Sequence, residues 1–264
     1  MKSCYLRSIC MEQPDSQKTV VIGGISGGIG SSLARSLSGK GIRITGFAKT
    51  AEKLEALSSI IPGVQTSVVD ATQPEAMDQF FAETTERFGR IDAYVPAIGS
   101  ILIKPAHLTA PQDWEKTLQI NLSSAFFALR SCVKQMQKQG GGSCLFFSTT
   151  AAQTGIANHE AIAAAKGGIE AMVRSAAATY APRGVRVNAI APSLTDTPLA
   201  QPILSSEKAI DISKRMHPLC DIAKAPDVAS LAEWLIGDTA GFVTGQTFVI
   251  DGGLSTIVPK PRVQ

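Results

Sequence analysis

A glycine-rich segment near the start of this chain constrains the possible folds most strongly. Residues 19–22 form a β-branched apolar run, residues 23–30 contain five glycines, and residues 29–37 then show helical spacing of apolar side chains. Such a turn lets the backbone approach a pyrophosphate closely, and a helix amino terminus offers free N–H groups and the positive end of its dipole. A strand before the loop and a helix after it are the context that dinucleotide binding requires. We therefore predict a dinucleotide site here.

The same alternation of strand and helix continues along the chain. Extended apolar runs are predicted at residues 42–47, 64–69, 91–95, 144–147, 185–190 and 247–250, and helices at 74–88, 111–139 and 157–180. The strands are apolar on both faces, which is typical of a parallel sheet covered by helices. The pattern predicts an α/β chain: a single-domain, doubly wound parallel sheet (Rossmann fold) of about seven strands with helices on both faces.

The predicted domain occupies residues 18–258 of the 264 residues, between an N-terminal tail at 1–17 and a C-terminal tail at 259–264. Met11 is an alternative translation start. Residues 198–226 form the longest interval without a predicted strand, which favours a substrate loop or lid.

Composition excludes several classes of partner. The net charge of +3 is small and scattered, so we expect neither nucleic-acid binding nor a membrane-surface role. No apolar run reaches the ~18 residues of a membrane span, and residues 1–10 lack the apolar core of a secretory signal. The five cysteines show no metal-ligand spacing, so we expect no metal site and a reducing, cytoplasmic location.

The residues after the second and third strands bear on the choice of nucleotide. Dinucleotide folds commonly place an acidic residue at the end of the second strand to hold the ribose 2′-OH, but this chain carries Lys49 there. A lysine can meet a 2′-phosphate, which favours NADP(H) over NAD(H); a solvated lysine facing Glu52 is the alternative. Asp70 is placed either to touch the adenine or to cap the helix that begins near Pro74.

Several ordered motifs together resemble the short-chain dehydrogenase/reductase family over residues 19–254. They are Gly24-x3-Gly28-x-Gly30 with Gly23 in place of a threonine, Asp70, Ile120-Asn121-Leu122, the run from Arg186 to Pro192, Thr197, Thr244-Gly245-Gln246 and Asp251-Gly252-Gly253. The resemblance implies a nicotinamide cofactor held by Gly24, Ser26, Gly28, Ile29, Gly30, Lys49, Asp70, Ala71, Gly99, Lys166, Pro192, Thr195 and Thr197.

The catalytic residues that the resemblance implies are only partly present. The family uses a serine, a tyrosine 13 positions later and a lysine four positions after that; the lysine is Lys166, but Ile162 and Thr149 stand at the other two positions. The family's N-N-A-G segment appears here as residues 96–99, of which only Gly99 matches. Asn121 and Lys166 remain, with Thr149 as a substitute hydroxyl. Isoleucine has no proton to give to a reduced carbonyl oxygen.

His159 is the candidate replacement for the missing proton donor. It precedes Lys166 by seven residues, or two helical turns, which puts both side chains on one face with Ile162 between them. In the enoyl-reductase branch of the same family a tyrosine holds the corresponding place. Imidazole exchanges protons near neutral pH. The alternative is a polar residue at a helix start.

Three functions follow as hypotheses. The first is an NADP(H)-dependent oxidoreductase that acts on a carbonyl, a hydroxyl or an activated C=C bond, with catalytic residues Asn121, Thr149, His159 and Lys166. The second is an inactive NADP(H)-binding protein that acts as a sensor or oligomer partner, and the third is a structural subunit without cofactor. The partner is a small-molecule substrate under an apolar lid, in which we interpret Lys214 and His217 as solvated. The resemblance also implies a homodimer or homotetramer through helices 111–139 and 157–180.

Overall fold

The computed structural model describes residues 17–258. The predicted tails at 1–17 and 259–264 lie outside the described residues, except for Gln17. Met11 lies outside them too.

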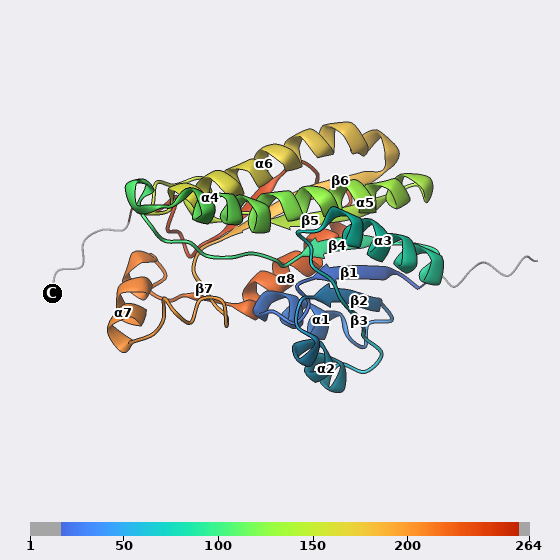
Figure 1. The fold of residues 1–264 in the computed structure, drawn as a ribbon, viewed down its shortest axis with the longest axis horizontal. Helices are drawn as coiled ribbons and strands as arrows, with labels where there is room; N and C mark the ends of the chain where they lie inside the picture. The colour runs from blue at the N-terminus through green and yellow to red at the C-terminus, as the bar shows by residue number, and fades with distance from the viewer. Residues whose placement is uncertain (1–16, 259–264) are drawn as a thin grey trace, which may run out of the picture.

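Seven parallel strands form the central sheet (Figure 1). Their order across the sheet is β3 (Gln65–Val68), β2 (Arg43–Ala48), β1 (Thr19–Gly23), β4 (Ala93–Pro96), β5 (Gly142–Phe147), β6 (Val185–Pro192) and β9 (Thr247–Ile250). The direction of winding reverses between β1 and β4, and doubly wound sheets bind their ligands outside the carboxyl ends of the strands at this switch point. The predicted fold class is confirmed.

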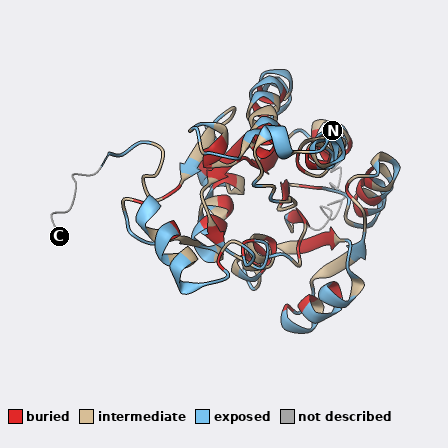
Figure 2. Ribbon diagram, turned by 60° about the vertical axis from the view of Figure 1, so that its left-hand side comes forward, coloured by how far each residue is buried: buried red, intermediate tan, exposed pale blue. Residues whose placement is uncertain are grey.

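Helices cover both faces of the sheet. On one face lie α1 (Gly28–Leu37), α2 (Ala51–Ile60) and α8 (Ala225–Ile236); on the other lie α3 (Pro74–Phe88), α4 (Pro111–Leu118), α5 (Ser124–Lys138) and α6 (Glu160–Tyr180). Two apolar clusters fill the two interlayer spaces, and the buried residues follow the sheet and the inner helix faces (Figure 2). We did not predict α2 and α8. In α2 only Leu54 and Leu57 are buried, which leaves little periodic signal.

The helix predicted at residues 111–139 is interrupted. A π-helical turn, Gln119–Ser123, joins α4 to α5 and contains the buried Asn121. The side-chain amide of Asn121 donates to the Thr117 carbonyl, 3.0 Å away, so it takes up the acceptor that a regular helix would use for the backbone N–H. Such turns are frequent at functional sites.

The interval at 198–226 contains more structure than predicted. It holds α7 (Glu207–Met216), whose first turn is capped by the Ser206 hydroxyl accepting from Ala209 N at 3.2 Å. The prediction that this interval contains no strand was wrong in one place, because β8 (Ala223–Lys224) pairs with β7 (Thr195–Asp196). That short pair fastens the two ends of the lid together, while α7 stands outside the helix layers (Figure 1).

Candidate active site

A pocket of about 330 Å³ lies at the carboxyl ends of β4, β5 and β6, between α6 and the lid. Most of its lining is apolar. Nine of the residues predicted for the site line it: Ile29, Gly99, Asn121, Thr149, His159, Lys166, Pro192, Thr195 and Thr197. Residues separated by more than 160 positions therefore meet at the edge of the sheet where the switch point predicts a ligand.

The glycine loop has the tight backbone that the sequence predicts. Gly24 has φ +66°, and its N–H donates to the Phe47 carbonyl at 2.7 Å. A Cβ at Gly30 would lie 2.4 Å from the Gly24 carbonyl oxygen, and one at Gly28 would lie 2.6 Å from Cγ2 of Thr197. No side chain among the described residues caps the amino terminus of α1, so its first N–H groups are available to phosphate oxygens. Ser26 and Ile29 belong to the same loop and first turn. The loop fits the pyrophosphate of a dinucleotide.

Lys49 and Asp70 lie together where β2 and β3 end. The Lys49 amine is 2.9 Å from Oδ2 of Asp70, and Oδ1 accepts hydrogen bonds from the Thr72 N–H and hydroxyl at 2.8 and 2.6 Å. Burial opposes ionisation of Asp70, but the hydrogen bonds from Thr72 and Lys49 outweigh it and lower the pKa of the carboxyl. The N-cap of α3 is Gln73, so the capping alternative for Asp70 was wrong. Ala71 follows, buried.

Lys166 is buried in the floor of the pocket, with 8% of its surface exposed. Its amine donates to the Phe147 carbonyl at 2.9 Å, and burial lowers its pKa to about 8. A Cβ at Gly99 would lie 3.0 Å from Oδ1 of Asn121 and 3.8 Å from the Lys166 amine. A side chain at residue 99 would thus fill the space that these two groups share, which explains why the glycine is needed.

Asn121 is held by Ser100, a pocket residue that sequence reasoning missed. The Asn121 amide nitrogen donates to the Ser100 hydroxyl at 2.9 Å, and its oxygen accepts from the Ser100 N–H at 3.1 Å. Asn121 therefore ties the segment after β4 to the π-helical turn. No local pattern marks Ser100, because its partner is 21 residues away.

His159, Ile162 and Thr149 all line the pocket. The predicted helix start at residue 157 was wrong: Asn158 has φ +65°, so α6 begins at Glu160 and His159 is its N-cap. Nδ1 of His159 lies 2.7 Å from the Ala157 carbonyl. A carbonyl only accepts, so Nδ1 carries a proton in this contact.

The prediction for His217 was also wrong. We expected a solvated ring, but only 3% of the residue is exposed, and its Nε2 lies 2.9 Å from the hydroxyl oxygen of Ser193. Both residues line the pocket. The available signal was the helical spacing of Ser213 and His217 on the inner face of α7. Lys214 pairs with Asp221 at 3.0 Å and remains 43% exposed, as expected.

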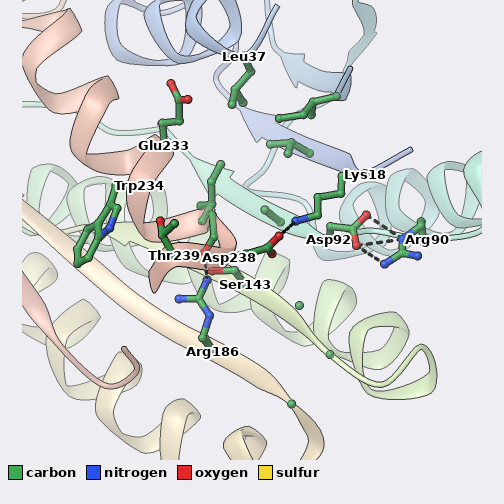
Figure 3. A pocket seen from close by; sticks show the side chains of 18 of the residues that line it. Lys18, Leu37, Arg90, Asp92, Ser143, Arg186, Glu233, Trp234, Asp238 and Thr239 are labelled. Carbon is green, nitrogen blue, oxygen red and sulfur yellow. Dashed lines mark hydrogen bonds and ion pairs between the residues drawn. The ribbon is translucent and has the colours of Figure 1, made fainter. Parts of the chain in front are cut away.

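A larger pocket, of about 800 Å³, lies at the opposite edge of the sheet (Figure 3). Its charged side chains all have partners: Lys18 pairs with Asp238, Arg90 with Asp92 and Glu233 with Lys40, and Arg186 donates to carbonyls that include that of Leu235. It contains none of the predicted site residues. We therefore take the smaller pocket as the candidate active site.

Two further searches covered residues 17–258. No group of three or more His, Cys, Asp or Glu side chains there is arranged to hold a metal ion. No helix in that part of the chain is long and apolar enough to cross a membrane.

Comparisons with known proteins identify the family of this chain. The family described as enoyl-(acyl carrier protein) reductase matches residues 24–255. D-threitol dehydrogenase of Mycolicibacterium smegmatis is 33% identical, over 89% of this chain and 92% of that protein. Cis-4-hydroxycyclohexanecarboxylate dehydrogenase of Sinomonas cyclohexanicum is 30% identical, over 94% of this chain and 100% of that protein. The crystal structure of levodione reductase has a TM-score of 0.88 at 29% identity, covering 91% of this chain and 98% of that one. The chain belongs to the short-chain dehydrogenase/reductase family, an oxidoreductase family that uses nicotinamide cofactors.

Proposed function

We propose that this protein is an NADP(H)-dependent oxidoreductase that acts on a carbonyl or hydroxyl group, or on an activated C=C bond, of a small-molecule substrate. One observation carries the proposal: the glycine loop, Asn121, Thr149, His159 and Lys166 converge on one apolar pocket. A protein that only bound the nucleotide would not need a polar cluster next to an apolar chamber.

The chain's own residues would hold the cofactor along the carboxyl edge of the sheet. The α1 amino terminus would bind the pyrophosphate, and Thr197 and Lys166 would hold the nicotinamide end. The nicotinamide supplies or accepts the hydride. Lys49, at 59% side-chain exposure, is accessible to a 2′-phosphate, which supports NADP(H) over NAD(H). Its amine is shared with Asp70, so the phosphate would compete with that carboxylate.

His159 would supply the proton that Ile162 cannot. With Nδ1 held by the Ala157 carbonyl, a protonated His159 has its Nε2 proton available for a substrate oxygen in the pocket. The Thr149 hydroxyl would hydrogen-bond that same oxygen. Lys166 would remain a positioning and binding residue, because its amine is engaged by the Phe147 carbonyl.

The test is NADPH and NADH titration by nicotinamide fluorescence, combined with NADPH oxidation on a panel of ketones, quinones and enones. His159→Ala is expected to keep NADPH affinity and to lose about 100-fold or more in turnover. His107→Ala, a histidine on the exposed helical turn Ala106–Leu108, is the matched control and is expected to change neither. Unchanged turnover in His159→Ala would refute the assigned donor.

A second candidate function rests on Ile162. Its apolar side chain, 6% exposed, lies one helical turn before Lys166 where the family resemblance places a phenol. If NADPH binds tightly and no substrate on the panel is turned over, the protein is an NADP(H)-binding sensor or an inactive oligomer partner.

The proposal includes assembly into a homodimer or homotetramer in the cytoplasm. Support comes from α5 and α6: Phe126 on α5 is 52% exposed, and α6 carries the small residues Gly167 and Gly168. Sedimentation velocity of the wild type and of Phe126→Lys tests the assembly.

A further inference from the structure

The lid contributes one polar cluster to a largely apolar chamber. Ser193 follows β6, and His217 ends α7, 24 residues later; their side chains meet at 2.9 Å. The neighbouring lid side chains in the pocket are apolar, among them Leu199, Ile203 and Met216. The pair therefore places polar groups on a wall of the pocket that is otherwise apolar.

Both members of the pair are held by the backbone. The Ser193 N–H donates to the Ile250 carbonyl at 3.2 Å, which anchors it to the edge strand β9. Nδ1 of His217 lies 2.7 Å from the Ser213 carbonyl, one turn earlier in α7. The ring also packs against Gly252, where a Cβ would lie 3.5 Å from the Cβ of His217. The pair is therefore preorganised on both sides.

The hydrogen positions follow from these contacts. Because the Ser213 carbonyl can only accept, Nδ1 of His217 carries a proton. In the neutral ring Nε2 then has a lone pair, and the Ser193 hydroxyl donates to it. The single hydroxyl hydrogen of Ser193 is then engaged by His217, so the Ser193 oxygen can only accept a hydrogen bond from a ligand in the pocket.

The charged side chains around His217 are engaged with other partners. Asp251 interacts electrostatically with His217, and its oxygens accept hydrogen bonds from the N–H groups of Gly253 and Ser255 at 2.9 Å each. Lys214, on the same helix, is paired with Asp221 on the outer surface.

We propose that Ser193 and His217 form a recognition site for a hydroxyl group that the substrate carries away from its reacting carbon. The inference rests on the proposed function, in which the reacting oxygen lies at the Thr149 and His159 wall while this pair belongs to the lid wall. A pocket of about 330 Å³ is at the small end of small-molecule sites, so the substrate class is a ring-sized hydroxy ketone or diol.

The test uses four matched ring ketones that differ only at the position opposite the carbonyl. 4-Hydroxycyclohexanone offers a donor, 4-methoxycyclohexanone keeps the oxygen without the hydrogen, cyclohexane-1,4-dione offers only an acceptor, and cyclohexanone has neither. Dissociation constants are measured by ligand-observed NMR on the full chain saturated with NADP⁺, and turnover is measured separately with NADPH. The wild type is expected to bind the hydroxy ketone at least about tenfold more tightly than the other three.

Variants separate recognition from folding. In Ser193→Ala the dissociation constants of the four ketones are expected to lie within about twofold of one another. Ser193→Thr, which keeps a hydroxyl, is expected to restore the preference for the hydroxy ketone. Ser205→Ala changes an exposed serine of the lid and is expected to leave that preference unchanged. Thermal melting and NADPH affinity check that each variant is folded. A hydroxyl preference that persists in Ser193→Ala, equal binding of all four ketones by the wild type, or no binding of any of them would overturn the inference. A hydroxyl preference in binding without NADPH oxidation would refute the proposed function and leave the recognition site standing.

Discussion

The buried amine of Lys166 makes the free energy of unfolding of this protein change with pH in the alkaline range. Burial lowers its pKa from the ordinary 10.5 to about 8, and no described ion pair offsets that burial. Between these values the unfolded chain binds more protons than the native one, so the free energy of unfolding rises with pH across this window. Below about pH 8 the full cost of burying the charge is present.

The magnitude follows from the shift. A difference of about 2.5 in pKa, at about 1.4 kcal/mol per unit, gives a cost of about 3 kcal/mol below pH 8, of which about 2 kcal/mol is recovered between pH 7 and pH 9.5. Lys166→Met removes the titrating group but keeps the apolar stem. It also leaves the Phe147 carbonyl without its donor, at a cost of about 1–3 kcal/mol, so near pH 7 the two effects offset each other.

Urea unfolding of wild type and Lys166→Met at about pH 7, 8, 9 and 9.5 measures the difference directly. We expect the free energy of unfolding of the wild type to rise by about 2 kcal/mol relative to that of Lys166→Met across this pH range. Lys53→Met, on the exposed side of α2, is the control and is expected to run parallel to the wild type. A stability difference between wild type and Lys166→Met that stays constant with pH would show that the buried amine titrates at its ordinary pKa, and the reasoning would be wrong.

Two further predictions concern the cofactor. In Gly30→Ala the new Cβ would lie 2.4 Å from the Gly24 carbonyl oxygen, so the loop must shift; we expect at least tenfold weaker NADPH binding in fluorescence titration, whereas Gly167→Ala, which meets no atom within 4 Å, should bind normally. Asp70→Asn removes the carboxylate that holds Lys49, so we expect the ratio of NADPH affinity to NADH affinity to rise severalfold. Lys49→Ala should bring that ratio close to one. An equal ratio in the wild type and both variants would exclude Lys49 from phosphate recognition.

Elements with strong local punctuation could be predicted closely. The predicted bounds of α3 agree with the structure because Pro74 opens it and Gly89, at φ +75°, ends it. The start of α6 was misplaced, because a left-handed Asn158 interrupts a run of good helix formers. The π-helical turn could not be predicted, since it depends on the Asn121 amide reaching the Thr117 carbonyl after the helix has formed.

The sequence by itself determined the parallel sheet covered by helices and the tight glycine loop. These follow from periodicity and glycine geometry, which are properties of short segments, whereas the candidate roles of Asn121, Thr149 and Lys166 came from the family resemblance. Only the tertiary structure decided which polar groups meet. Lys49 pairs with Asp70 from another strand, Lys166 loses water and shifts its pKa, and His217 turns inward onto Ser193. Each of these outcomes depends on solvent exclusion and contacts between elements, which no local pattern encodes.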